Sequence, residues 1–340
     1  MSEASLSAAE LAARRDLSFA KRGLLWALLS GVLWGANGVL LGAGLNREPF
    51  AGSPLLLLAP LTLAAMHDVL SGLWNLLYNW RTGRIREIGR SLFTRPGLSV
   101  CLGAVFGGPV GMGAYLIGLN MAGPAYVLPV TSLYPAVAAA LAMIFLKEKI
   151  VARAWAGLAL CVLGVALIGW APPETAPGPH FFLGIGIAAL ATLGWGAEGV
   201  LSTSGMDLLD PAVALNIRQI VSGSVYLLVV LPLAGGWSLL GQAVFSPAAP
   251  FICVASALGA TSYLCWYRGM NMTGVSRAMA CNGTYALWGI LFSALFTDTE
   301  ITRNLVIGAV VILGGMILVV GNPKDMTTLR KTTQEAACSE

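Results

Sequence analysis

Trp34-Gly35-Ala36-Asn37-Gly38-Val39-Leu40 returns later in the chain as Trp195-Gly196-Ala197-Glu198-Gly199-Val200-Leu201. The two heptapeptides differ only where Glu198 stands in place of Asn37. Because both lie in the middle of long apolar stretches, the repeat predicts a membrane protein built from two similar halves. The single difference places a carboxylate at mid-membrane depth in one half, a combination typical of a transport pathway.

Composition leads to the same class of protein independently of the repeat. Of the 340 residues, 57% are hydrophobic and only 11% are charged, and the mean hydropathy is +0.77. A chain of this kind cannot surround a soluble core with a solvated surface. The predicted fold class is therefore an all-α integral membrane protein.

Ten apolar stretches are long enough to cross the hydrocarbon core, which takes roughly 20 helical residues. We expect transmembrane helices near residues 22–44, 54–80, 97–119, 124–146, 151–171, 181–205, 212–234, 250–270, 275–297 and 303–321. The first stretch is too long for a signal peptide, so we interpret it as a retained helix. The predicted domains are a tail (1–21), a first five-helix repeat (22–171), a Pro-rich connecting loop (172–180), a second five-helix repeat (181–321) and a second tail (322–340).

The similarity between the halves extends beyond the heptapeptide. Gly118-Leu119-Asn120-Met121-Ala122-Gly123 matches Gly269-Met270-Asn271-Met272-Thr273-Gly274, and the same register pairs Tyr134 with Tyr285. Because five is an odd number of spans, the second half must enter the membrane from the opposite side. Inverted repeats of this kind are the architecture of alternating access, in which the halves exchange conformations around a central site.

The basic residues predict the orientation. With the N-terminus inside, all of the 20 lysines and arginines except Arg47 and Arg303 lie at or near the cytoplasmic side. Cytoplasmic loops of membrane proteins carry this excess of positive charge, so both termini are expected to be cytoplasmic. The net charge of +4 thus reflects topology, and no nucleic-acid partner is expected.

Several local strings resemble a known family. Leu146-Lys147-Glu148 followed by Gly157 and Gly164, with Trp-Gly near the middle of the first helix of each half, resembles the EamA-type branch of the drug/metabolite transporter superfamily over roughly residues 22–321. A narrower resemblance, to the bacterial choline permeases that supply phosphorylcholine for cell-surface polymers, is carried by Met66-His67-Asp68, Gly108–Met112, Leu133-Tyr134-Pro135, Trp195–Glu198, Ile217-Arg218-Gln219, Ser262-Tyr263-Leu264 and Tyr285–Trp288. It departs at Trp266 and Met279, and it implies a proton-coupled importer of choline or a related quaternary ammonium compound in the bacterial cytoplasmic (inner) membrane.

Aromatic side chains near span centres are the candidate binding residues. A quaternary ammonium group cannot donate a hydrogen bond, so its site needs aromatic faces, each contributing roughly 0.5–2 kcal/mol through cation–π attraction. Spacings of three or four place such residues on shared helix faces. The predicted substrate-binding residues are Trp34, Trp195, Glu198, Tyr263, Tyr267, Tyr285, Trp288 and Asn282. The alternative for any one aromatic residue is packing or anchoring at the membrane interface.

Ionisable residues inside the spans are the candidates for coupling or gating. Glu198 is predicted to balance the cation or to take up the coupling proton, and its alternative role is an ion pair with Arg218. His67 and Asp68 are adjacent, and neighbours on a helix point about 100° apart, so they cannot both face one small ligand. His67 is either a proton relay or a satisfied hydrogen-bonding residue. Arg218 lies where either carboxylate can neutralise it.

Other function classes find little support in the chain. The only histidines are His67 and His180, no H-x-x-x-H or C-x-x-C motif occurs, and Cys101, Cys161, Cys253, Cys265 and Cys281 lie inside predicted spans. We therefore expect no metal, no cofactor and no ATP-driven step. The predicted function is a secondary transporter, with a small organic cation and the lipid bilayer as partners and the proton as candidate coupling ion. An exporter of amphipathic cations or metabolites is the first alternative, and a membrane-embedded enzyme the second.

Overall fold

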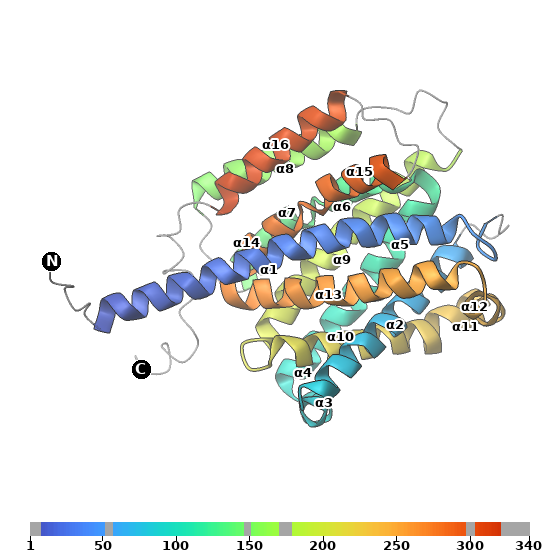
Figure 1. The fold of residues 1–340 in the computed structure, drawn as a ribbon, viewed down its shortest axis with the longest axis horizontal. Helices are drawn as coiled ribbons and strands as arrows, with labels where there is room; N and C mark the ends of the chain where they lie inside the picture. Colours follow the sequence, from blue (N-terminus) through green and yellow to red (C-terminus); the bar gives the residue numbers. More distant parts are fainter. Residues whose placement is uncertain (1–7, 52–56, 146–150, 170–178, 297–302, 321–340) are drawn as a thin grey trace.

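The computed structural model describes residues 8–51, 57–145, 151–169, 179–296 and 303–320. Throughout these ranges the chain is helical, with turns between the helices and no strand. Figure 1 shows the helices gathered into one bundle. Their bounds are α1 (Ala8–Leu45), α2 (Leu58–Arg81), α3 (Ile85–Ser91), α4 (Arg95–Val105), η1 (Phe106–Met112), α5 (Gly113–Ala122), α6 (Pro124–Thr131), α7 (Tyr134–Phe145), α8 (Ala152–Gly169), α9 (Phe181–Gly205), α10 (Pro211–Val225), η2 (Tyr226–Val230), α11 (Leu231–Ala234), α12 (Trp237–Val244), α13 (Ala249–Thr273), α14 (Val275–Asn282), α15 (Tyr285–Phe296) and α16 (Arg303–Val320).

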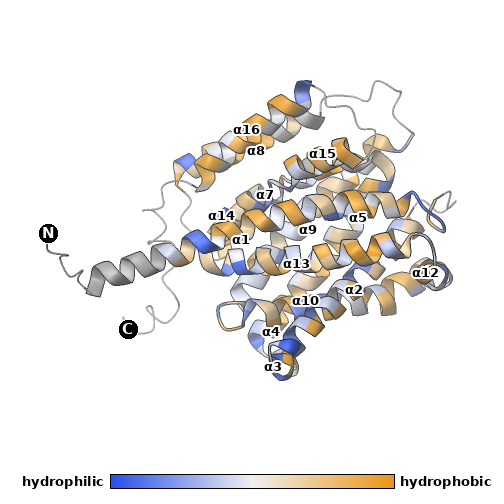
Figure 2. Cartoon of the chain, in the orientation of Figure 1, coloured by the Kyte–Doolittle hydropathy of each residue, from blue (hydrophilic) through white to orange (hydrophobic). Residues whose placement is uncertain are grey.

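The protein is a multi-pass membrane protein. Six helical stretches among the described residues are long and apolar enough to cross a membrane, namely Ser18–Leu45, Arg95–Ala122, Phe181–Gly205, Pro211–Ala234, Ala249–Thr273 and Val275–Phe296. Shorter apolar helices cover Tyr134–Phe145, Ala152–Gly164 and Val306–Val319. Leu25, Phe182, Leu233 and Ile317 are each more than half exposed on the outside of the bundle, and Figure 2 shows the hydrophobic colour continuing over these outer helices. Such exposed apolar surface is stable against lipid rather than water.

The two halves make matching contacts. Helix α1 packs along α13 and α5 packs along α9, so each half places its first long helix against the other half. Helices α8 and α16 run side by side at one edge of the bundle (Figure 1). A methyl group on Gly157 would lie 2.5 Å from the carbonyl oxygen of Gly315, and one on Gly164 would lie 2.7 Å from that of Gly308. Small residues therefore allow the backbones of α8 and α16 to touch.

Each half also contains a helix that is interrupted at the same place. Gly123 and Gly274 precede α6 and α14 with φ angles of 78° and 84°, a backbone region that favours glycine. Both helices then break, and the next helix begins at Tyr134 in one half and at Tyr285 in the other. The tyrosine pairing expected from the sequence thus marks equivalent structural positions.

A π-helical segment, η1, lies where the third predicted span packs against α9. In η1, which contains Pro109, a methyl group on Gly107 would overlap the carboxylate of Glu198, and one on Gly111 would lie 2.7 Å from Trp195 Cδ1. Only glycine leaves room for these two side chains of α9. The glycines of η1 therefore determine how closely the candidate residues of α9 approach the centre of the bundle.

The helix bounds differ from the predicted spans in places. Helix α1 begins at Ala8 rather than near residue 22, and short helices α3 and α12 lie in predicted connecting segments. The Leu146-Lys147-Glu148 string, the tails beyond residue 320 and before residue 8, and most of the connecting loop lie outside the described residues.

Candidate functional site

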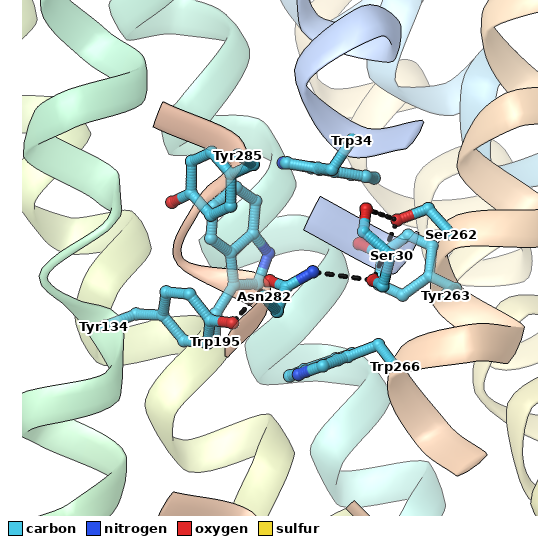
Figure 3. A pocket seen from close by; sticks show the side chains of 9 residues that line it. All are labelled: Ser30, Trp34, Tyr134, Trp195, Ser262, Tyr263, Trp266, Asn282 and Tyr285. Atoms are coloured by element: carbon cyan, nitrogen blue, oxygen red, sulfur yellow. Dashed lines mark hydrogen bonds between the residues drawn. The ribbon is translucent and has the colours of Figure 1, made fainter. Parts of the chain in front are cut away.

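A cavity lined by buried side chains lies where the two halves meet. It is lined by side chains from α1, α7, α9, α13, α14 and α15, namely Ser30, Trp34, Tyr134, Trp195, Ser262, Tyr263, Trp266, Asn282 and Tyr285 (Figure 3). All nine residues are buried, and about 20 Å³ is open to the centre of a water molecule. A space of this size holds about one or two water molecules and is far smaller than a drug-sized site.

Aromatic rings form most of the cavity wall. The ring centroid of Trp34 lies 5.0 Å from that of Tyr263 and 5.7 Å from that of Trp195, both in edge-to-face geometry. Tyr134 and Tyr285 stack at 6.2 Å with 20° between their planes. Aromatic contacts at these distances fix ring orientation, so the faces turned to the cavity are held in place.

A chain of neutral hydrogen bonds crosses the site. The Tyr134 hydroxyl donates to Asn282 Oδ1 at 2.5 Å, and Asn282 Nδ2 donates to Ser30 Oγ at 2.6 Å. Ser262 Oγ donates to the Ser30 carbonyl oxygen at 2.8 Å. Figure 3 shows this chain between the aromatic rings. The polar groups of the cavity are thus largely satisfied by one another and carry no charge.

The two interrupted helices are joined by reciprocal bonds. Tyr134 donates to Asn282 of the second half, and the Tyr285 hydroxyl donates to Thr131 Oγ1 of the first half at 3.0 Å. In each case the first residue after one break bonds the last helical residue before the other break. These equivalent contacts connect the halves directly at the cavity.

A buried ion cluster lies behind the aromatic wall. Arg218 of α10 donates from Nε to Glu198 Oε1 at 2.8 Å and from Nη1 to Asp68 Oδ2 at 3.0 Å. Its Nη2 donates to the hydroxyl of the cavity residue Tyr263 at 3.1 Å. Tyr267 donates to Glu198 at 3.0 Å, and Ser222 donates to Asp68. The three ionic side chains are fully buried, and with both carboxylates ionised the cluster holds one negative charge in excess.

His67 connects this cluster to the aromatic wall. Its Nδ1 lies 3.4 Å from Asp68 Oδ1, and its Nε2 lies 3.2 Å from Asn37 Oδ1. The ring meets Trp34 edge-on at 6.1 Å. Asn37 occupies the position in the first heptapeptide that Glu198 occupies in the second. At this one position where the two copies differ, Asn37 contacts His67 and Glu198 contacts Arg218.

Known proteins resemble this chain in sequence and in fold. The family model described as the EamA-like transporter family matches residues 21–170 and again residues 182–321. The chain belongs to the EamA-like transporter family. Protein LicB of Haemophilus influenzae is 30% identical over 272 residues, which cover 79% of this chain and 87% of LicB. A solved structure described only as the crystal structure of a protein has a TM-score of 0.64 and 16% identity, covering 87% of this chain and 95% of its own, and it shows the fold alone.

Membership of this family establishes the general activity. The chain is a membrane transporter rather than an enzyme, its partners are a small-molecule substrate and the lipid bilayer, and the EamA-type resemblance seen in the sequence is confirmed. Among the described residues, no group of three or more His, Cys, Asp or Glu side chains is arranged to hold a metal ion.

The structure brings together some predicted site residues and separates others. Trp34, Trp195, Tyr263, Asn282 and Tyr285 all line the one cavity. The remaining predicted binding residues do not line it, namely Glu198, Tyr267 and Trp288. Of the coupling candidates, His67, Asp68 and Arg218 belong to the polar network behind the wall.

The position of Trp288 shows why a spacing of three residues from Tyr285 does not by itself place a side chain in the cavity. Trp288 lies three residues after Tyr285, but its Cβ is placed where a methyl group on Gly35 would meet it at 2.7 Å, and its ring stacks on Phe292 at 6.3 Å. Residues three apart still differ by about 60° around a helix axis. Because α15 packs closely on α1, this rotation turns Trp288 away from the cavity.

Four lining residues were absent from the predicted set, namely Ser30, Tyr134, Ser262 and Trp266. Tyr134 had a usable signal, because it is the repeat equivalent of Tyr285. Trp266 lies between Tyr263 and Tyr267 in the sequence, where two aromatic neighbours could have drawn attention to it. The serines carry no sequence signal, since small hydroxyl residues are common in packed membrane helices.

Proposed function

We propose that this transporter imports choline or a related quaternary ammonium compound across the bacterial cytoplasmic membrane by alternating access. The observation that carries the proposal is an aromatic cavity with neutral polar groups inside it and one excess carboxylate charge behind its wall. The resemblance of the sequence to bacterial choline permeases supports the same substrate class.

The chemistry of the cavity matches that of a quaternary ammonium ion. Such a cation has no N–H to donate, so hydrogen-bond acceptors at the cation itself gain nothing over aromatic faces. Each favourable face contributes roughly 0.5–2 kcal/mol, and Trp34, Trp195, Tyr263 and Tyr285 offer several at once. A primary amine would instead require acceptors for each of its three donors.

The excess negative charge supplies the electrostatic balance. Glu198 and Asp68 share Arg218, so the cluster attracts one monovalent cation or one proton. Tyr263 links the cluster to the cavity, because its ring lines the cavity while its hydroxyl accepts from Arg218. We propose that occupancy by the substrate and protonation in the region of Glu198, Asp68 and His67 are coupled through this contact, as proton symport requires.

The proposed architecture is ten transmembrane helices in two inverted five-helix repeats, residues 22–171 and 181–321, with both termini cytoplasmic. Matching contacts between the halves support it: the paired glycines of α8 and α16, and the reciprocal bonds of Tyr134 and Tyr285. Two halves held by equivalent contacts can exchange conformations, which opens a central site to either side in turn.

Transport of labelled choline tests the proposal. Cells containing the protein should accumulate more label than cells lacking it, and vesicles reconstituted with the purified protein should move label without altering it chemically. Greater accumulation in cells that lack the protein would instead establish an exporter.

Two variants test the site itself. Glu198→Gln should weaken choline binding and reduce its pH dependence, because it removes a carboxylate from the ion cluster. Trp195→Ala should weaken binding while the pH dependence is largely retained, because it removes only an aromatic face. If both variants bind choline as the unaltered protein does, the proposed site is refuted.

A further inference from the structure

One hydrogen-bond donor of the cavity is left without a protein partner. Trp266 is only 4% exposed, and no acceptor among the described residues lies within hydrogen-bonding reach of its indole Nε1. Trp195 of α9, which lines the same cavity, differs, because its Nε1 donates to the carbonyl oxygen of Gly107 at 3.1 Å. A buried polar group that lacks a partner is unfavourable, so such groups are uncommon in folded proteins.

The surroundings of Trp266 hold the indole in position. Its ring meets Tyr267 edge-on at 5.6 Å and Tyr263 at 6.0 Å, both on α13, and it meets Tyr134 of α7 at 6.1 Å. In Figure 3 the ring nitrogen lies at the end of the indole directed toward Asn282 and Tyr134. The N–H is therefore fixed at the cavity wall by packing on both sides.

We propose that Trp266 determines specificity by donating its indole N–H to an oxygen on the tail of the substrate. This inference rests on the proposed function, and it narrows the substrate from any quaternary ammonium ion to one that bears an oxygen acceptor. The ammonium head lies against the aromatic faces of Trp34, Trp195 and Tyr263, and the tail reaches Trp266.

The tail oxygen is a hydroxyl rather than a carboxylate. A hydroxyl accepts from Trp266 and still has a proton to donate, and Asn282 Oδ1 and the Ser30 hydroxyl lie in the same cavity as acceptors. A carboxylate offers no proton to these oxygens, and it would be placed near an ion cluster that already has one carboxylate in excess over Arg218. Choline therefore fits better than a betaine.

The test compares two cations of the same shape. Choline and propyltrimethylammonium have the same number of heavy atoms, but only choline carries the oxygen. Binding of each to the purified full-length protein is measured by titration calorimetry, with glycine betaine as a third ligand. The unaltered protein should prefer choline about tenfold over propyltrimethylammonium, the factor expected for one buried hydrogen bond.

Trp266→Phe keeps a six-membered aromatic ring and removes the indole N–H together with the five-membered part of the ring. It should weaken choline binding about tenfold and leave propyltrimethylammonium binding within twofold, so that the preference disappears. Trp237→Phe is the matched control, because it makes the same chemical change at a half-exposed tryptophan outside the cavity, and it should leave both affinities unchanged.

The outcomes separate this inference from the proposed function. If the unaltered protein binds choline and propyltrimethylammonium equally, or if Trp266→Phe weakens both to the same extent, the hydrogen bond to Trp266 is refuted while the aromatic cation site stands. Tighter binding of betaine than of choline refutes the hydroxyl assignment. If none of the three ligands binds, the quaternary ammonium site itself is refuted. Should Trp266→Phe fail to fold, equal binding of choline and propyltrimethylammonium by the unaltered protein still refutes the hydrogen bond.

Discussion

Replacement of Arg218 by methionine tests whether the buried ion cluster stabilises the fold as the structure implies. Arg218 has no exposed surface and donates to Glu198 at 2.8 Å, to Asp68 at 3.0 Å and to Tyr263 at 3.1 Å. Methionine fills much of the same space but leaves two buried carboxylates close together without a counter-charge. The variant therefore isolates the charge from the packing.

The expected loss of stability follows from these contacts. Removing one partner from a buried ion pair costs about 3–5 kcal/mol, because the remaining charge stays desolvated. Tyr267 still donates to Glu198 and Ser222 still donates to Asp68, so partial compensation places the loss toward the lower end of that range. A loss of about 3 kcal/mol corresponds to a fall in melting temperature on the order of 5–10 °C.

Thermal unfolding in detergent, followed by tryptophan fluorescence, measures the change. The matched variant combines Arg218→Met with Asp68→Asn and Glu198→Gln, which removes all three charges. It should recover most of the lost melting temperature, because neutral replacements of buried ion clusters are often close to neutral in stability. An Arg218→Met melting temperature within 2 °C of the unaltered protein, or no recovery in the triple variant, would refute the reasoning.

Three further predictions concern contacts between the helices. Gly157→Ala should lower the melting temperature because its methyl group meets the backbone of α16, whereas Gly314→Ala, where a methyl group meets no atom within 4 Å, should not lower it. Gly107→Ala should weaken choline binding, because the methyl group overlaps the Glu198 carboxylate and displaces it from the cluster; unchanged binding would contradict this. Tyr134→Phe removes the hydroxyl that donates to the opposite interrupted helix, which should lower stability by about 1 kcal/mol. It should also change the transport rate, measured by uptake into vesicles, more than Trp237→Phe does at the exposed Trp237 of α12.

The sequence by itself was sufficient for the class of protein and for much of its internal repetition. Apolar stretches of about 20 residues leave no other stable fold, because every backbone polar group in lipid must be bonded within the segment. The repeated register placed Tyr134 opposite Tyr285, and both begin a helix after an equivalent break. The matching residues of the two halves were enough to predict this pairing, because similar sequences fold into similar helices.

The sequence also identified aromatic residues that meet at one cavity. Trp34 and Trp195 occupy the same position in the two heptapeptides, and their rings lie 5.7 Å apart. Residues at equivalent positions of two packed halves approach one another across the interface. Trp34 and Trp195 line the cavity for this reason, and Tyr263, Asn282 and Tyr285 line it as well, although the role of all five in binding choline stays a prediction.

Only the tertiary structure decided which partners the charged and polar side chains have. Arg218 contacts both carboxylates at once, Trp288 turns toward Gly35, and Trp266 presents an unpaired N–H at the cavity wall. These outcomes depend on the rotation of each helix about its axis and on how closely its neighbours approach. Rotation and approach are determined by contacts between segments far apart in the chain, and no spacing within a single helix contains that information.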